Sequence, residues 1–182
     1  MRVKIEFYES LTDEQLLAEI WEILCECDHD FVPHLSARES SYQSSFQDEE
    51  SKNVLPQTYY EVMIKQHFLM AIDEQTRKLA GFMTFKSNYD CEELKHASPS
   101  NYITTICIKK DYRNKGITRQ FYQMIESDLI PENVRMPYLS TRTWSLNLSH
   151  LHLLDSFGFT LAMRLPNHRG PGIDTVYYSK KV

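Results

Sequence analysis

The sequence predicts an α+β fold, in which a single twisted, mostly antiparallel sheet of six to seven strands carries helices on both faces. β-branched and aromatic runs joined by short turns predict neighbouring antiparallel strands. Several segments repeat apolar residues at helical spacing, and one such segment links two strands near the middle of the chain. The chain of 182 residues is long enough for a sizeable core, and we expect residues 1–182 to form one domain.

Composition and residue spacing argue against several classes of function and indicate a cellular compartment. The net charge of −5 argues against a general nucleic-acid-binding protein, which needs a basic face. No apolar run approaches the roughly 20 residues of a membrane span, and no secretory leader follows Met1, so we expect a cytoplasmic protein without a membrane segment. The Cys25-x-Cys27 spacing is too tight for a zinc knuckle, so we expect no metal site. We interpret all four cysteines as reduced and structural: Cys25, Cys27, Cys91 and Cys107.

The first half of the chain predicts a strand and then a capped helix. Residues 4–8 alternate as a short strand. Thr12 to Gln15 form a capping box, and an apolar helical stripe follows it. Residues 31–53 are polar and predict a connection with a short helix. The elements expected next are a helix, two hairpin strands and a polar loop, at residues 56–65, 66–72, 78–86 and 87–100.

The stretch Asn101 to Glu126 organises the centre of the chain. β-branched residues dominate Tyr102 to Ile108, so this run predicts a strand. After Gly116 the apolar residues recur at helical spacing, so a helix follows a short basic turn. Such a turn aims the unpaired N–H groups of a helix's first turn at one point, and that point favours phosphate. Gly116 lets the backbone approach a ligand closely.

A second pattern lies downstream, in Asn147 to Phe159. Asn147 is a good N-cap for a short helix, and Gly158 suits the left-handed residue at which a helix ends. Strands are expected on either side of this helix and at the end of the chain, at residues 138–144, 160–165 and 173–179.

Together the two patterns resemble the GNAT superfamily of acyl-CoA-dependent N-acyltransferases. Arg113-x-x-Gly116-x-Thr118 after a strand is similar to the family's pyrophosphate-binding turn, although the family prefers glycine or alanine at the position of Thr118. Asn147 and Gly158-Phe159 match the family's next landmark in order and spacing. The resemblance implies a GNAT-like fold and acetyl-CoA as co-substrate.

The resemblance also implies which residues hold acetyl-CoA. N–H groups of the turn would bind the pyrophosphate, supported by the Arg113 and Lys115 side chains. Backbone groups of the central strand would pair with the pantetheine arm, and an N–H near Ile108 would polarise the thioester. The Asn147 side chain would bond the pantetheine amide. The full set of cofactor-binding residues expected is Ile106, Cys107, Ile108, Arg113, Asn114, Lys115, Gly116, Ile117, Thr118 and Asn147.

The catalytic residues follow less directly, because the chain departs from the family pattern twice. The family's acid is a tyrosine seven residues after the asparagine, and Leu154 occupies that position. His150 lies one helical turn earlier on the same face, and we expect it to replace the acid. The strand before Ile106 carries no carboxylate or histidine, so the base is expected among Glu92, Glu93 and Tyr102, which the sequence does not rank.

Arg142 and Trp144 alternate with two threonines along the strand expected at residues 138–144. One of the two sets faces the site or the core. For Arg142, a surface salt bridge and a place in the site are equally supported by the sequence.

The predicted function is therefore an N-acetyltransferase that transfers an acetyl group from acetyl-CoA to a primary amine of a small molecule or a protein. The alternative is a catalytically silent acyl-CoA-binding module for sensing or protein assembly, because the family's acid and base are missing. The acceptor pocket is expected from residues 31–53, 87–100 and 166–172, which carry no recognisable code for the acceptor. The last strands could also pair in a homodimer.

Overall fold

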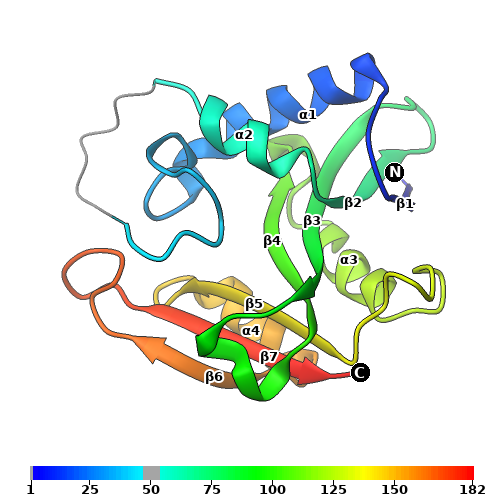
Figure 1. Cartoon of the computed structure of the whole chain (residues 1–182). Helices are drawn as coiled ribbons and strands as arrows, with labels where there is room; N and C mark the ends of the chain where they lie inside the picture. Colours follow the sequence, from blue (N-terminus) through cyan, green and yellow to red (C-terminus); the bar gives the residue numbers. More distant parts are fainter. Residues whose placement is uncertain (1, 47–53) are drawn as a thin grey trace. The chain divides into compact units, whose positions relative to one another are not determined.

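The computed structural model describes residues 2–46 and 54–182 (Figure 1). Its strands form a seven-stranded sheet in the order β1-β2-β3-β4-β5-β7-β6. β1 pairs with β2, β5 with β7 and β6 with β7 in antiparallel fashion, whereas β4 and β5 are parallel. The predicted α+β fold with a mostly antiparallel sheet is confirmed. The strands are β1 (Val3–Tyr8), β2 (His67–Asp73), β3 (Leu79–Tyr89), β4 (Ser100–Ile108), β5 (Tyr138–Trp144), β6 (Thr160–Leu165) and β7 (Thr175–Lys181).

The helices connect these strands as their apolar spacing predicts. α3 provides the crossover between the parallel strands β4 and β5, as parallel pairs require. The α-helices are α1 (Glu14–Cys27), α2 (Gln57–Met63), α3 (Ile117–Ile125) and α4 (Leu148–Ser156). Short 3₁₀ turns lie at η1 (Asp28–Asp30), η2 (Leu35–Ala37), η3 (Glu92–Ala97) and η4 (Lys110–Tyr112).

The chain divides into two compact units. The first contains Met1–Thr84 and Thr105–Ser127, and the second contains Phe85–Thr104 and Asp128–Val182. The expectation of one domain over residues 1–182 stays a prediction. Part of the polar segment expected at residues 31–53, namely residues 47–53, lies outside the described residues.

In the first unit, α1 and α2 cover one face of β2, β3 and β4. Their buried side chains form a single apolar cluster with these strands. α3 contacts β1 and β2, and Figure 1 shows it behind the sheet, on the face opposite α1 and α2. The cluster comprises Ile20, Ile23, Leu24, Cys27, Leu35, Tyr59, Met63, Phe68, Met70, Ile72, Leu79, Phe82 and Cys107.

The start of α1 differs from the expected capping box. The N-cap is Asp13, whose Oδ1 accepts from the N–H groups of Gln15 at 2.9 Å and Leu16 at 3.0 Å. A carboxylate at this position also complements the positive end of the helix dipole, so Asp13 caps the helix in place of Thr12.

The second unit is built on β5, β7 and β6. Register places Arg142 opposite Tyr177 and Trp144 opposite Thr175, so these four side chains share one face of the β5–β7 pair. η3 contacts all three strands, β5, β6 and β7. In α4, Leu154 is fully buried.

The polar loop expected at residues 87–100 is more ordered than its composition indicates. β3 continues to Tyr89, η3 follows, and β4 already begins at Ser100. Similarly, the last strand begins at Thr175 rather than at residue 173, because Ile173 donates its N–H to Gly170 inside the preceding loop.

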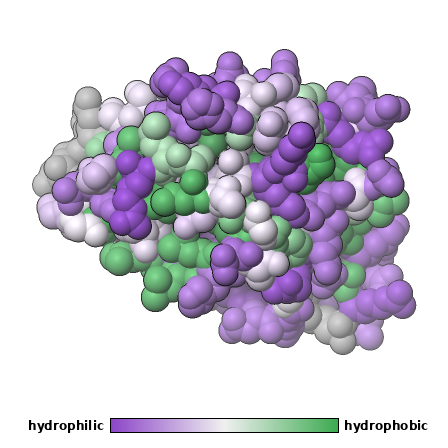
Figure 2. Space-filling model, turned by 90° about the horizontal axis from the view of Figure 1, so that it is seen from below, coloured by the Kyte–Doolittle hydropathy of each residue, from purple (hydrophilic) through white to green (hydrophobic). Residues whose placement is uncertain are grey.

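Hydrophilic side chains dominate the exposed surface, and apolar ones interrupt them in places, as Figure 2 shows for one face. The large apolar side chains exposed among the described residues are Val54, Leu55, Leu129, Leu146, Leu148, Leu161 and Val182. Within the same described residues, no helix is long and apolar enough to cross a membrane.

Candidate active site

The turn between β4 and α3 has the backbone geometry of an anion-binding loop. Asn114 and Gly116 both adopt left-handed conformations, with φ angles of 59° and 76°. α3 begins at Ile117, and its first-turn N–H groups have no partner within the helix. Gly116 is the N-cap and has no side chain with which to satisfy them. The turn therefore presents backbone donors and the positive end of a helix dipole at the exposed residues Asn114 to Gly116.

Gly116 is required by its backbone angle rather than by lack of space. A Cβ atom at this position would meet no heavy atom within 4 Å. A φ of +76° is nevertheless strained for residues with a side chain, and most strained for β-branched ones.

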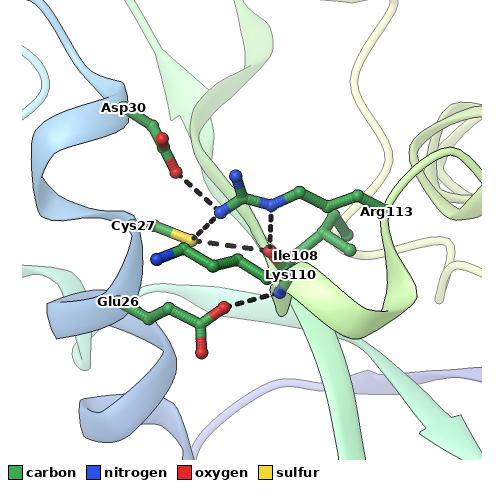
Figure 3. Close-up of polar contacts among 6 residues, drawn as sticks. All are labelled: Glu26, Cys27, Asp30, Ile108, Lys110 and Arg113. Carbon is green, nitrogen blue, oxygen red and sulfur yellow. Dashed lines mark hydrogen bonds and ion pairs between the residues drawn. The ribbon is translucent and has the colours of Figure 1, made fainter.

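The Arg113 side chain differs from its expected role of supporting a phosphate. Its Nε donates to the Ile108 carbonyl at 3.0 Å, and its Nη2 lies 2.7 Å from Asp30 Oδ2 (Figure 3). The guanidinium thus fastens the turn to η1. Lys115 is also engaged within the turn, because its Nζ donates to the Asp111 carbonyl at 2.5 Å. Backbone N–H groups at the start of α3, which have no partner within the helix, are therefore the candidates for binding a phosphate.

The end of β4 presents backbone groups on the side opposite β3. Lys109 N–H donates to Ala80 of β3 at 2.9 Å, so the Ile108 carbonyl points away from β3. Because a strand residue directs its N–H and C=O to the same side, the N–H groups of Ile106 and Ile108 share this direction. The register of β4 with β5 ends at Ile103–Thr141, which leaves Ile106 and Ile108 beyond it. These are the backbone positions expected to pair with an extended ligand.

Cys107 has a buried side chain, and its backbone groups point toward β3, opposite to those of Ile106 and Ile108, so its orientation does not support the expected cofactor contact. Burial is the largest cause that raises the pKa of the Cys107 thiol, and its hydrogen bond to Cys27 adds to the increase. The same hydrogen bond lowers the pKa of Cys27, against the effect of burial and with help from the Arg113 charge.

In the second unit, Asn147 acts as the N-cap of α4. Its Oδ1 accepts from the His150 N–H at 3.4 Å, and its Nδ2 donates to Thr143 Oγ1 at 3.1 Å. An amide side chain has two donors and two acceptor positions, so one of each is left for a ligand. The predicted pantetheine contact of Asn147 stays a prediction.

His150 is poorly suited to the expected role of acid. His150 is half-buried, and desolvation lowers its pKa to about 4. At pH 7 only about one molecule in a thousand would carry the proton that an acid must donate. The spacing that favoured His150 could not reveal this burial. Leu154, at the position of the family's tyrosine, is fully buried and offers no proton either.

The low pKa of His150 predicts how the free energy of unfolding depends on pH. The folded state binds this proton less readily than the unfolded chain, so His150 lowers the free energy of unfolding as pH falls from about 6.5 to about 4. Above pH 6.5 it has no such effect. We expect His150→Leu to lose less thermal stability than the wild type between pH 7 and pH 4, measured by circular dichroism.

The exposed His152, two residues away, provides the matched control. His152→Leu should follow the wild-type pH dependence. If His150→Leu and the wild type lose stability in parallel, desolvation of His150 is not the cause.

The three residues expected to include the base have different environments. Glu92 is exposed and pairs with Lys95 at 2.8 Å. Tyr102 is buried and stacks on Tyr89 with ring centroids 4.3 Å apart, and burial raises its pKa well above the usual range. Glu93 is half-buried. The pKa of the Cys91 thiol is raised to about 11, first by burial and then by the hydrogen bond between this thiol and Glu93.

Tyrosine side chains lie around Arg142, for which the sequence left two interpretations open, and its place in the site stays a prediction. Arg142 is half-buried. Its Nη1 donates to Tyr177 Oη at 3.1 Å, and its guanidinium lies 5.9 Å from the centre of that ring. Tyr89 and Tyr102 contribute to its electrostatic environment. The alternation along β5 contained this signal, but the partners come from three other strands.

The predicted site residues are therefore distributed over both units. Ile106, Cys107 and Ile108 lie with the turn from Arg113 to Thr118 in the first unit. Glu92, Glu93, Tyr102, Asn147 and His150 lie in the second unit. Sequence reasoning missed Glu26 of α1 and Asp30 of η1, which contact the loop after β4. No local pattern indicates them, because each lies more than 80 residues from its partner in the sequence.

Comparison with solved structures finds the same fold in acetyltransferases. An Acinetobacter baylyi ADP1 protein named as an acetyltransferase matches with a TM-score of 0.65 and 17% identity, over 100% of this chain and 95% of its own. Salmonella typhimurium yncA, solved with its cofactor acetyl-CoA, matches with a TM-score of 0.61 and 15% identity, over 100% and 94%. Arabidopsis thaliana NAA60, solved with a bisubstrate analogue, matches with a TM-score of 0.62 and 18% identity, over 98% of each chain.

Comparison with curated protein sequences finds no match. The family model of the acetyltransferase (GNAT) family matches residues 18–159, which include the turn after β4 and the capped helix α4. The resemblance in the sequence is thereby confirmed, and this chain belongs to the GNAT family of acetyltransferases.

Proposed function

We propose that this protein transfers an acetyl group from acetyl-CoA to a primary amine of a small molecule or a protein. The observation that carries the proposal is the turn from Arg113 to Thr118, in which left-handed Asn114 and Gly116 precede the N–H groups at the start of α3. This geometry suits a pyrophosphate, because N–H groups at a helix start bind anions without an additional charge. Membership of an acetyltransferase family supplies the class of reaction.

The backbone of β4 complements the turn. A pantetheine arm contains amide groups that can pair with an extended strand as another strand would. The N–H groups of Ile106 and Ile108 face the side away from β3, which suits this pairing. We propose that the N–H of Ile108 also donates to the thioester oxygen as negative charge develops there.

The proposed reaction is a direct acyl transfer. The lone pair of the neutral amine forms a bond to the thioester carbon, and the C–S bond then breaks. The amine loses one proton to a base, and the departing thiolate takes up one proton. A thiolate is a good leaving group, so the reaction tolerates the loss of the acid at Leu154.

Among the residues expected to act as the base, Glu93 is the most suitable. It is an ionisable carboxylate that is half-buried, whereas Glu92 is tied to Lys95 at the surface. Tyr102 retains its proton over the working pH range because its pKa is raised by burial. We propose that Glu93, directly or through a water molecule, accepts the proton of the amine.

A second function is supported by one observation. The position of the family's acid is a fully buried leucine, Leu154, and His150, one helical turn earlier, is neutral at pH 7 because desolvation lowers its pKa to about 4. A protein that only bound acyl-CoA, for sensing or assembly, would need neither group. We favour the enzyme, because thiolate departure does not require an acid.

Binding and turnover separate these functions. We expect isothermal titration to detect acetyl-CoA binding at sub-millimolar concentration, and we expect thiol release with at least one member of an amine panel. The panel should include polyamines, amino sugars, aminoglycosides and peptides with free N-termini. Absence of binding would contradict both functions, whereas binding without turnover across the panel would support the silent module. A Glu93→Gln variant that kept full turnover would exclude Glu93 as the base.

A further inference from the structure

The loop that follows β4 is attached to the end of α1 by a set of polar contacts (Figure 3). Lys110 N–H donates to Glu26 Oε1 at 2.5 Å. The Cys27 thiol donates to the Ile108 carbonyl at 3.6 Å. These contacts join Glu26 and Cys27, at the end of α1, to the two ends of the segment Ile108–Lys110, which leads into the turn.

Arg113 completes the attachment from the other side of the segment. One guanidinium donates to the Ile108 carbonyl, to Asp30 and, at 3.6 Å, to the Cys27 sulfur. The planar guanidinium presents its donors in a fixed geometry, so satisfying all three partners defines its orientation. Asp30 is the charged member of this set.

The backbone of this segment is fixed at the carbonyl of Ile108 and at the N–H of Lys109. The Ile108 carbonyl is held by Arg113 and Cys27, and the next N–H, that of Lys109, donates to Ala80. Arg113 begins the sequence Arg-Asn-Lys-Gly that carries the left-handed residues of the turn. A shift of Arg113 would therefore move the backbone donors that follow it, whereas the Cys27 thiol and the Lys109–Ala80 bond keep the Ile108 backbone in place.

We propose that Asp30 is a positioning residue for the pyrophosphate-binding turn. By holding the Arg113 guanidinium against the Ile108 carbonyl, it sets where the backbone donors point, and it does so without touching the cofactor. The inference rests on the proposed role of the turn from Arg113 to Thr118 in binding acetyl-CoA. It assigns a function to η1, which no sequence pattern linked to the cofactor.

The negative charge of Asp30 allows the direction of the change in acetyl-CoA affinity to test the proposal. A carboxylate near a phosphate site repels the phosphate, so its removal would strengthen binding if charge alone mattered. A positioning role predicts the opposite result, because the turn loses its preorganised geometry. The direction of the change in affinity therefore distinguishes the two effects.

The test compares Asp30→Asn, Asp30→Glu and the wild type with two ligands, acetyl-CoA and S-acetylpantetheine, which lacks the pyrophosphate. We expect Asp30→Asn to raise the Kd for acetyl-CoA about fivefold, the upper range for a partly exposed ion pair. The Kd for S-acetylpantetheine should not change. Asp30→Glu should recover part of the affinity, because it retains the charge.

Asp128→Asn is the matched control, because Asp128 also pairs with an arginine, Arg135, in the other unit. It should bind both ligands as the wild type does. A double-mutant cycle adds a check: Asp30→Asn in an Arg113→Ala background should cause no further loss, since the two residues act as one device.

Three outcomes would overturn the inference. Equal loss for both ligands would give Asp30 a general structural role, and tighter acetyl-CoA binding would make it a competitor of the phosphate. Unchanged acetyl-CoA binding in Asp30→Asn would show that the ion pair positions nothing. Failure of the proposed function is distinguishable, because the wild-type protein itself would then not bind acetyl-CoA.

Discussion

Replacing Gly116 with valine is expected to raise the Kd for acetyl-CoA at least about a hundredfold, which corresponds to the loss of roughly two charge-assisted hydrogen bonds. Gly116 has a φ of +76°, and a β-branched residue avoids this region strongly. Valine would relax toward negative φ and rotate the N–H groups at the start of α3 away from their common point. Isothermal titration with acetyl-CoA measures the change.

Gly158 provides a close control for this substitution. It has the same φ of +76°, and a Cβ atom there would also meet nothing within 4 Å. Gly158→Val should therefore lower the melting temperature about as much as Gly116→Val, while it leaves the Kd for acetyl-CoA near that of the wild type. If both variants bound acetyl-CoA normally, the turn would not hold the pyrophosphate. If both lost binding to the same extent, the loss would reflect destabilisation of the protein.

The fold could be predicted because its determinants are local. The alternation at residues 138–144 and 160–165 coincides with β5 and β6, and the helical spacing after Gly116 coincides with α3. The misplaced features are those in which two local signals compete. At the start of α1, the carboxylate of Asp13 takes the cap that Thr12 was expected to provide. In the loop before β4, polar composition concealed both the end of β3 and η3.

The backbone part of the site was also predictable, because a left-handed glycine before a helix is a property of a few consecutive residues. The side-chain part was not. Whether Arg113 faces a ligand or the protein depends on Asp30, which is 83 residues away. The pKa of His150 depends on how far the fold removes it from water, and spacing along one helix cannot show that. Long-range packing thus decides which of the polar residues remain available for chemistry.

Arg113→Ala is the second substitution with a large expected effect. We expect the Kd for acetyl-CoA to rise about 5-fold to 150-fold, or about 1–3 kcal/mol, the range for a charge-assisted hydrogen bond. The reason differs from a lost contact with phosphate. The guanidinium bonds Ile108 and Asp30 in this structure, so its removal frees the loop that carries the backbone donors.

Arg113→Lys distinguishes positioning from charge. Lysine keeps the positive charge, but it has no Nε–H group in the guanidinium plane and cannot bond the Ile108 carbonyl and Asp30 in the same geometry. If Arg113 acts by positioning, the lysine variant should bind acetyl-CoA nearly as weakly as the alanine variant. Affinity close to that of the wild type would show instead that a cation near the phosphates is sufficient. Arg135→Ala, which removes an arginine paired with Asp128 in the second unit, should leave binding unchanged in either case.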